Sequence, residues 1–316
     1  MSAQDALKAL SAGFEALAAQ AAKSVFHVGG ESLSFRSGVL IDDKHVLVPA
    51  AMAEAGERIE LRAPDGSTVA AEVKGYDPFS ELAVVALDKD FSGAAFELAP
   101  KARLGQLALT VAHPSPEGHE VRMDVIRCVG GPTRLGPGLR IDSYLQTDGL
   151  PFPGFAGAPV VDLDGKLIGI ISSNAMGNAS FVIPAAEVLD IAKRLIEHGS
   201  PVRGYVGLRT KPVKDKGLLV FEVEKDSPSE KAGIRVGDIL QSWDGQVLKS
   251  PSDLLEILAS WKGSGSVKVV LSRGDASVEL NVEPAKRSMN DAGGWDWHHH
   301  GGHDHHRGGQ HRHSHR

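Results

Sequence analysis

An amphipathic helix is predicted at the start of the chain. Apolar side chains recur at alternating spacings of three and four, at Leu7, Leu10, Phe14, Leu17 and Ala21. This spacing places them on one stripe of a helix. We therefore expect a helix within residues 1–23 whose stripe packs against the following domain. A short oligomerisation helix is the alternative, for which two heptads are a short length.

Short β-branched runs replace the helical period after residue 23. Runs such as HVLVPA, ELAVVAL and LIGIIS alternate with turn signals, among them Asp65-Gly66 and Asp164-Gly165, up to about residue 182. Many short strands at even spacing are typical of β-sandwiches and β-barrels. The segment AAEVLDIAKRLIEHG then predicts a helix that stops at Gly199 and closes a domain over residues 24–199.

A second unit is expected over residues 200–284. Its strand-like runs are YVGLRT, GLLVFEVE, DILQSWDG, VKVVLSR and VELNVE, and Asp244-Gly245 is typical of a hairpin turn. One helix begins at SPSDLLEILASW, where Ser250 and Asp253 form a capping-box pattern. Residues 285–316 contain almost no apolar side chains, so we expect a flexible tail there.

Composition and charge exclude several classes of protein. The chain has 316 residues, enough for two domains and tails, and its net charge of -6 argues against a general nucleic-acid binder. No apolar run reaches 18 residues, so no membrane span is expected. Gln4, Asp5, Lys8 and Glu15 interrupt any signal-peptide core, which predicts a cytoplasmic protein. Cys128, the single cysteine, is expected to be a small buried side chain.

The order of the motifs resembles the HtrA-type, DegP-like serine proteases. SGVLIDDKHVLVPAAMA is similar to the family's strand pair ending in T-N-A-H-V-V, and DPFSELAVVAL to its D-x-x-x-D-L-A-V-L segment. LQTDGLPFPGFAGAPVVDLDGKLIGI is similar to the segment that carries the nucleophile, and VRGYVGLRT to the start of the PDZ domain. The resemblance covers roughly residues 24–284. It implies a mainly β fold, with a trypsin-like double six-stranded β-barrel followed by a PDZ domain.

All three catalytic triad positions implied by this resemblance are substituted. Ala51 stands at the histidine position, Glu81 at the aspartate position and Ala156 at the serine position. A methyl group neither attacks a carbonyl nor accepts a proton, and removing the nucleophile or the base of a comparable hydrolase costs about 10⁶ in rate. We therefore expect a pseudoprotease that is not an enzyme. The oxyanion loop, matched at Gly154 and Ala156, is expected to persist only as geometry.

Other histidines and two phenylalanines lie near these positions in the sequence or close to the motifs that contain them. His45, His113 and His119 have no nucleophile placed beside them by any motif, so we expect surface histidines. Phe152 and Phe155 stand where the family carries small or polar residues. They are predicted to plug the catalytic cleft, with an apolar patch that grips a peptide as the alternative.

The second domain is expected to bind peptides. PDZ domains add an extended peptide as a strand and receive its terminal carboxylate on the backbone N–H groups of a loop. Four residues match this loop by resemblance, namely Tyr205, Val206, Gly207 and Leu208. The family resemblance implies a preference for apolar C-termini, with the helix from residue 251 to 261 as the other wall. A groove filled by the protein's own chain, or a rigid spacer, is the alternative.

Histidines dominate the end of the chain. Nine of the 14 lie in the tail, at His298, His299, His300, His303, His305, His306, His311, His313 and His315. Imidazole suits zinc, copper and nickel, so we expect the tail to bind a divalent transition metal with poor selectivity, less tightly below about pH 6.5. The tail resembles those of nickel-handling accessory proteins. A solubilising tail or an artificial tag is the alternative, and the interruptions of the tract favour a native tail.

Two functions are favoured by the sequence, and a third, a working protease, survives only if residues other than the triad positions act. The first is a non-catalytic HtrA-like scaffold or adaptor that binds peptides or protein C-termini through its PDZ domain, with a metal-binding tail. The alternative is a nickel or zinc buffering or delivery protein in which the tail carries the function. No cofactor is expected to be required for folding, and the family resemblance allows a trimer.

Overall fold

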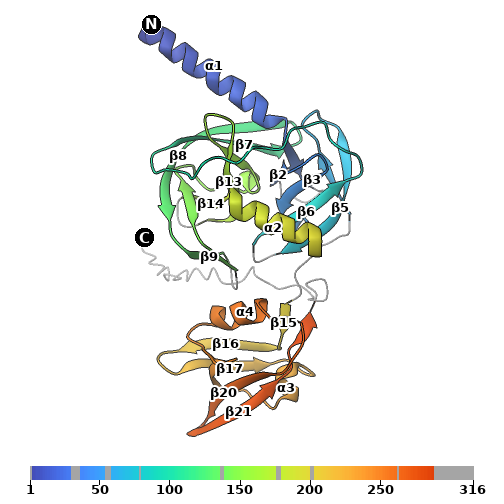
Figure 1. Cartoon of the computed structure of the whole chain (residues 1–316), viewed down its shortest axis with the longest axis vertical. Coiled ribbons are helices and arrows are strands. Elements are labelled where there is room, and N and C mark those ends of the chain that lie inside the picture. Colours follow the sequence, from blue (N-terminus) through green and yellow to red (C-terminus); the bar gives the residue numbers. More distant parts are fainter. Residues whose placement is uncertain are drawn as a thin grey trace, which may run out of the picture.

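The computed structural model describes residues 2–29, 36–53, 58–77, 80–135, 139–175, 179–199, 203–261 and 263–287. A helix, two closed six-stranded barrels and a smaller sheet with two helices follow one another along the chain (Figure 1). The expected fold class, mainly β with a double barrel, is confirmed. No helix of the described chain is long and apolar enough to cross a membrane.

The first barrel forms from the β-branched runs of residues 25–87. Its strands are β1 (Val25–Val28), β2 (Arg36–Leu40), β3 (His45–Pro49), β4 (Arg58–Arg62), β5 (Thr68–Asp77) and β6 (Leu82–Leu87). They are ordered β1-β2-β3-β6-β5-β4, and pairing of β1 with β4 closes the barrel. A short 3-10 helix, η1 (Ala50–Met52), follows β3.

The second barrel repeats this arrangement. Its strands are β7 (Leu107–Ser115), β8 (Gly118–Gly130), β11 (Tyr144–Thr147), β12 (Pro159–Val161), β13 (Leu167–Ala175) and β14 (Ser180–Pro184). The order is β11-β14-β13-β12-β7-β8. A hairpin of β9 (Thr133–Leu135) and β10 (Leu139–Ile141) and the 3-10 helix η2 (Pro153–Phe155) lie between strands. The segment AHPSPEGHE is polar and contains two prolines, a pattern typical of a loop, but the β7–β8 pairing continues through it to Ser115 and Gly118.

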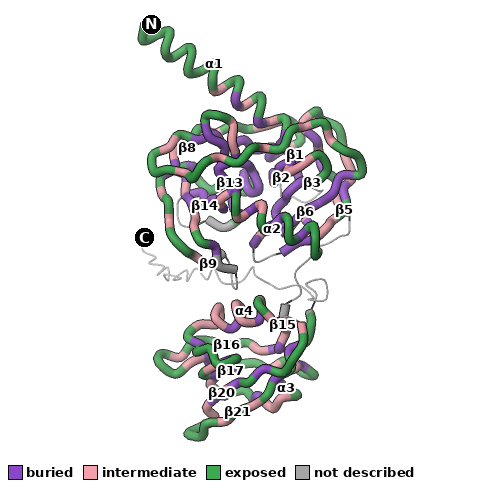
Figure 2. Tube along the Cα trace, in the orientation of Figure 1, coloured by how far each residue is buried: buried purple, intermediate pink, exposed green. Residues whose placement is uncertain are grey.

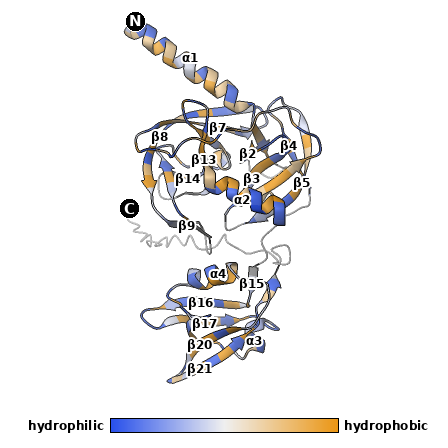
Figure 3. Ribbon diagram, in the orientation of Figure 1, coloured by the Kyte–Doolittle hydropathy of each residue, from blue (hydrophilic) through white to orange (hydrophobic). Residues whose placement is uncertain are grey.

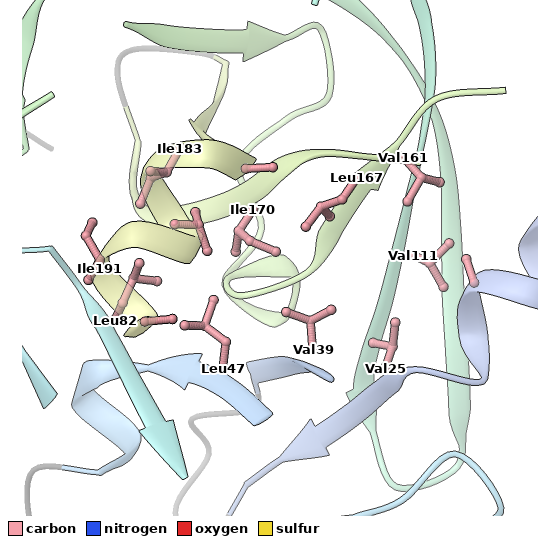
Figure 4. Packing of buried hydrophobic residues seen from close by; sticks show 14 of the residues in the cluster. Val25, Val39, Leu47, Leu82, Val111, Val161, Leu167, Ile170, Ile183 and Ile191 are labelled. Atoms are coloured by element: carbon pink, nitrogen blue, oxygen red, sulfur yellow. The ribbon is translucent and has the colours of Figure 1, made fainter. Parts of the chain in front are cut away.

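One apolar core joins the two barrels. Helix α2 (Ala185–His198) buries Val188, Ile191 and Leu195 in it and ends at Gly199, which has φ 73°. Figure 4 shows side chains of both barrels in this cluster, including Val25, Val39, Leu47 and Leu82 from the first and Val111, Val161, Ile170 and Ile183 from the second. Because the core is shared, the residues at the junction of the barrels are held in a packed framework.

Helix α1 (Ala3–Ala22) is only half packed. Ser2 caps it, and Leu17 and Ala21 are buried in the shared core. Leu7 and Leu10 are 68% and 51% exposed on the half that extends beyond the barrels (Figures 2 and 3). The prediction that the whole apolar stripe packs on the next domain is therefore correct only for its C-terminal half.

The second unit contains a six-stranded sheet and a separate two-stranded sheet. It contains β15 (Arg203–Tyr205), β16 (Leu208–Val213), β17 (Gly217–Val223), α3 (Pro228–Lys231), β18 (Ile239–Trp243), β19 (Gln246–Val247), α4 (Pro251–Ala259), β20 (Val267–Arg273), β21 (Ala276–Val282) and β22 (Ala285–Arg287). The main sheet is ordered β16-β17-β18-β20-β21, with β19 paired to β18.

Two details of this unit differ from expectation. YVGLRT does not form one strand, because Val206 and Gly207 separate β15 from β16 and Gly207 has φ +71°. Residues 285–287, assigned to the tail, form β22 and pair with β15. A third difference lies in the second barrel, where Cys128 is half-buried rather than fully buried, since it lies on β8, whose residues alternate between the core and solvent.

Candidate functional site

Ala51 and Glu81 meet at the edge of the first barrel. Ala51 lies in η1, and the neighbouring amide of Ala50 donates to the carbonyl of Glu81 at 2.9 Å. The Glu81 backbone is left-handed, with φ 62°, a conformation that costs about 1–3 kcal/mol for a residue other than glycine. Its Oε2 accepts from Ser172 Oγ at 2.5 Å and from the Ser173 amide at 2.9 Å, both on β13. The Glu81 carboxylate therefore bridges the two barrels.

Ala156 lies across the same junction, directly after η2. Its carbonyl accepts from the Ser37 amide of β2 at 2.9 Å. At Gly157, with φ +84°, an added Cβ would stand 2.0 Å from the Ser37 carbonyl oxygen and 2.9 Å from Pro49. Since Pro49 precedes η1, the fold brings the segments of Ala51, Glu81 and Ala156 to one place, which we call the barrel junction.

One of the two expected oxyanion donors is used within η2. The amide of Ala156 donates to the Pro153 carbonyl at 3.1 Å, and that of Phe155 donates to the Phe152 carbonyl at 2.9 Å. The carbonyl of Gly154 accepts from Ser37 Oγ at 3.0 Å. Because oxyanion stabilisation requires N–H groups aimed at the substrate oxygen, a turn of this loop would be needed before the Ala156 amide could serve.

The two phenylalanines of the loop contact each other edge to face, with ring centroids 6.0 Å apart, but differ in exposure. Phe155 is 6% exposed, and the Arg122 guanidinium carbon lies 4.7 Å from its ring centroid. Phe152 is 54% exposed. Arg122 also donates to the Leu150 carbonyl at 2.8 Å and to Ser180 Oγ at 3.2 Å. One ring is thus buried while the other is largely exposed at its edge, and the expected role as a plug or as a peptide-gripping patch stays a prediction.

A buried ion pair supports this loop, and sequence reasoning missed it. Arg122 Nε lies 2.8 Å from Asp124 Oδ1, and Thr110 Oγ1 donates to the other carboxylate oxygen at 2.5 Å. Burial raises the pKa of Asp124 above its usual value. The available signal was the charged pair two residues apart in EVRMDVIRCV, which places both side chains on one face of a strand.

The histidines are not all on the surface. His45 and His119 are half-buried, but His113 is 3% exposed, so its assignment as a surface histidine is wrong. It is buried because β7 packs against β1 of the first barrel, a contact that local sequence does not reveal. Among the described residues, no group of three or more histidines, cysteines or acidic residues is placed to hold a metal ion.

The loop of the second unit that is expected to bind a carboxylate, at Val206 and Gly207, is fixed by hydrogen bonds to its backbone carbonyls. The Val206 carbonyl accepts from the Ser229 amide at 3.1 Å, and the Gly207 carbonyl accepts from the Glu224 amide at 2.9 Å. Tyr205 Oη donates to the Glu224 carboxylate. No backbone hydrogen bond within the described chain uses the amides of Val206 or Gly207. An anion could therefore approach these N–H groups without breaking such a bond.

Strand β16 lies at the edge of its sheet, paired only with β17 among the described strands. Helix α4 packs against β15 and β16, and an added Cβ at Gly204 would touch Leu258 of α4 at 3.2 Å. Arg209 on β16 forms an exposed ion pair with Glu222 at 3.5 Å, and Lys211 is exposed two residues further on. The second unit thus offers a strand edge next to a loop and a helix.

The remaining site expectation lies outside the described residues. The nine tail histidines from His298 to His315 are all in the part of the chain that the structure does not describe. Their expected binding of nickel, zinc or copper stays a prediction.

Comparison with known proteins supports both domains. A trypsin-like peptidase domain matches residues 29–170, and a PDZ domain matches residues 204–283. A probable periplasmic serine endoprotease, DegP-like, of Rhizobium meliloti (strain 1021) is 31% identical over 78% of this chain and 51% of its own length. A protein of the same name from Pseudomonas putida (strain W619) is 27% identical over 83% of this chain and 58% of its own length. The chain thus spans about half the length of the curated relatives it matches.

Solved structures share the fold. The serine endoprotease from Yersinia pestis superposes with a TM-score of 0.68 at 24% identity, covering 87% of this chain and 98% of the other. A solved structure of the HtrA-type protease AlgW with tripeptide gives a TM-score of 0.63 at 26% identity, covering 86% of this chain and 97% of the other. The resemblance to HtrA/DegP-like proteases of trypsin-like fold with a PDZ domain is supported.

The same comparisons correct two expectations. The relatives are named serine endoproteases, which contradicts the expectation that the chain is not an enzyme and points to a protease. They are also named periplasmic, which contradicts the expected cytoplasmic location and points to the periplasm. Both expectations rested on local features, namely the substituted triad positions and the polar N-terminus.

Proposed function

With the trypsin-like and PDZ domains of an HtrA/DegP-like protease present in one chain, we propose that this protein captures extended peptides or protein C-termini on its PDZ domain. The trypsin-like body carries this domain. The observation behind the proposal is the edge strand β16 beside a glycine loop whose two amides take no part in backbone hydrogen bonds of the described chain.

The chemistry of this edge favours a peptide with a free C-terminus. Main-chain N–H and C=O groups of β16 can pair with an added strand, and the loop amides of Val206 and Gly207 can receive its carboxylate. The last side chain would lie near Leu208 and Leu258, which belong to the apolar core of the domain. An apolar final residue therefore supplies the most binding energy, since burying such a side chain contributes about 1.5–3 kcal/mol.

Binding can be tested with labelled ten-residue peptides. We expect a peptide ending in valine or leucine to bind the full chain, and its C-terminal amide to bind at least tenfold more weakly, because the amide lacks the carboxylate charge. Fluorescence anisotropy measures both. Equal binding of the acid and the amide would contradict capture by the loop. A peptide could also bind elsewhere on the protein. Gly207→Ala is therefore the control, because weaker binding in this variant assigns the peptide to this loop.

The barrel junction can be tested in the same samples. The methyl side chains of Ala51 and Ala156 supply neither a nucleophile nor a proton acceptor, so any hydrolysis must draw these groups from elsewhere in the assembly or the substrate. Mass spectrometry of the bound peptide after incubation shows whether it is cleaved, and Glu81→Gln shows whether the bridging carboxylate takes part. The state of association, for which the family resemblance suggests a homo-oligomer, is read by sedimentation.

The histidine tail favours a second function, metal binding for buffering or delivery. The observation is the density of imidazoles, nine between residues 298 and 315. Imidazole suits nickel, copper and zinc, and a segment with many such rings can bring several of them to one ion. Calorimetry with nickel and zinc should show binding to the full chain and none to a chain lacking residues 290–316. If the shortened chain still binds peptide without metal, peptide capture and metal binding are separate functions. If it no longer binds peptide, the tail carries the main function.

A further inference from the structure

Three histidines meet where β1 of the first barrel crosses the β7–β8 hairpin of the second. His27 Nδ1 donates to the carbonyl of His113 at 3.0 Å, and His119 Nε2 donates to the carbonyl of Val25 at 3.0 Å. The rings of His113 and His119 stack with centroids 4.0 Å apart, and the ring of His27 lies 5.7 Å from that of His113. Both hydrogen bonds cross from one barrel to the other.

The surroundings of the cluster favour the neutral form of the His113 and His27 rings. His113 Nδ1 is buried without a hydrogen-bond partner in the described chain. Burial, followed by the charge of His119, lowers the pKa of His113 to about 4, and burial also lowers the pKa of His27. The positive charge of Arg62 on β4 acts on both rings, and Glu117 in the hairpin turn is the acidic group that acts on His27. Stacked imidazolium rings would repel one another at this distance.

The backbone of His113 connects the cluster to the barrel junction through one serine. The His113 amide donates to Ser37 Oγ at 2.9 Å, and Ser37 Oγ donates to the Gly154 carbonyl at 3.0 Å. The Ser37 amide donates to the Ala156 carbonyl at 2.9 Å. Ser37 is 0% exposed, so these bonds do not compete with solvent. Position 37 pairs directly with His27 on β1, and Arg36 beside it adds a further positive charge on β2.

We propose that His27, His113 and His119 form an acid-sensitive latch that holds the loop Gly154–Ala156 in its η2 conformation through Ser37. Protons taken from solvent onto the ring nitrogens open the latch. The charged rings separate, β1 and the hairpin move apart, and the His113 amide withdraws from Ser37. The loop is then free to turn, which releases the Ala156 amide from Pro153.

The latch gives the barrel junction two states that differ in bound protons. The opening equilibrium shifts by about tenfold per pH unit for each proton taken up, since the open state binds the protons that the closed state excludes. The closed state is therefore favoured at pH 7 and above, and opening becomes more frequent as the pH falls below about 6.5. This inference does not depend on peptide capture by the PDZ domain.

Hydrogen exchange of the full chain with added chelator tests the latch. Rates are measured at pH values from 7.5 to 5 and divided by the intrinsic rate at each pH. We expect protection of peptides covering residues 36–40 and 153–158 to fall at least tenfold between pH 7 and 5.5. Protection in β6 (Leu82–Leu87) and β20 (Val267–Arg273) should stay constant. An equal loss in β6 would show global unfolding of the body and overturn the proposal, as would pH-independent protection of the loop.

Three substitutions and one matched control assign the effect. His113→Gln removes a ring that burial keeps neutral and should flatten the pH dependence by about one proton. Should that chain fail to fold, the less buried His119→Gln removes the ring stacked on His113, whose charge lowers the pKa of His113, and should weaken the pH dependence. Ser37→Ala should weaken loop protection at pH 7 and make it insensitive to pH. His45→Gln alters a half-buried histidine bound to Asp42, away from the cluster, and should retain the wild-type profile. A flattened profile in His45→Gln, or an unchanged one in His119→Gln and Ser37→Ala, would overturn the latch.

Discussion

The barrel junction and the edge of the PDZ domain treat their polar backbone groups in opposite ways. At the junction, Ser37 alone engages two carbonyls of the loop, and the Ala156 amide donates within η2. At the PDZ edge, β16 pairs on one side, and the amides of Val206 and Gly207 take no part in the backbone bonds of the described chain. The junction is satisfied internally, whereas the PDZ edge is arranged to receive another chain.

This difference separates rigidity from recognition. A loop whose donors and acceptors are paired must break bonds before it changes shape, while an edge strand gains bonds on adding a partner. The body therefore resists rearrangement at neutral pH, and the PDZ domain supplies the available binding surface. Glycines at both places test this contrast, because each has a matched glycine with the same backbone angle in open space.

The largest effect is expected at Gly157, where the junction is tightest. Its φ of +84° is the same as that of Gly66, but a Cβ at Gly157 would meet the Ser37 carbonyl at 2.0 Å and one at Gly66 would meet nothing within 4 Å. Gly157→Ala should lower the free energy of unfolding of the body by at least about 3 kcal/mol, since the clash adds to backbone strain. Gly66→Ala should cost about 1 kcal/mol.

Calorimetry of both variants measures the cost. The body transition should fall by about 6 °C or more in Gly157→Ala and by about 2–4 °C in Gly66→Ala. Peptide affinity of the PDZ domain should be unchanged in both. Equal shifts for the two variants would mean that the junction relaxes freely and that the description of a rigid, satisfied loop is wrong.

A smaller, local effect is expected at Gly207 of the PDZ loop. Its φ is +71°, and an added Cβ would lie 2.3 Å from the Cβ of buried Ser227. Gly245, with φ +72°, has nothing within 4 Å. Gly207→Ala should displace the loop and weaken binding of a C-terminal peptide at least tenfold, while Gly245→Ala should lower stability by about 1 kcal/mol and leave affinity unchanged. Fluorescence anisotropy titration measures the peptide affinity of both folded variants. Equal affinities would show that the loop does not contribute to the peptide-binding site.

The sequence predicted the parts of the fold that depend on local pattern. The β-branched runs located most barrel strands, and Gly199 and Asp244-Gly245 marked a helix end and a hairpin turn that the structure contains. Three-residue strands such as β15 and β22 were missed, because each exists only through a partner about 80 residues away. Helix α3, with four residues, is too short to show a period.

The site was predictable in position but not in its connections. Motif order located Ala51, Glu81 and Ala156, which the fold places at one junction. The role of Ser37 could not be predicted, because its bonds to His113 and Gly154 join residues 76 and 117 positions apart. The burial of His113 was missed for the same reason. A polar run with two prolines is typical of a loop, and only packing against β1 makes it an interior strand.

The smallest effect sharpens the comparison through pH. The lowered pKa values of His113, about 4, and His27 mean that the unfolded body binds more protons than the folded body below about pH 6.5. The stability that the neutral rings of His113 and His27 contribute to the body is thus fully present above pH 6.5 and is lost as the pH falls toward 4. In the PDZ domain, the Arg273 ion pair and the amide of Arg235 outweigh burial and lower the pKa of Asp238, so acid loss of stability there begins only below about pH 4.

Calorimetry between pH 7.5 and 4.5 should move the body transition down by a few degrees and leave the PDZ transition in place. Gly157→Ala and Gly245→Ala identify the two transitions by the shifts they cause. Parallel acid shifts of both transitions would mean that the histidine cluster does not govern the body's acid response, and the contrast between a closed junction and an open edge would then rest on hydrogen bonds alone.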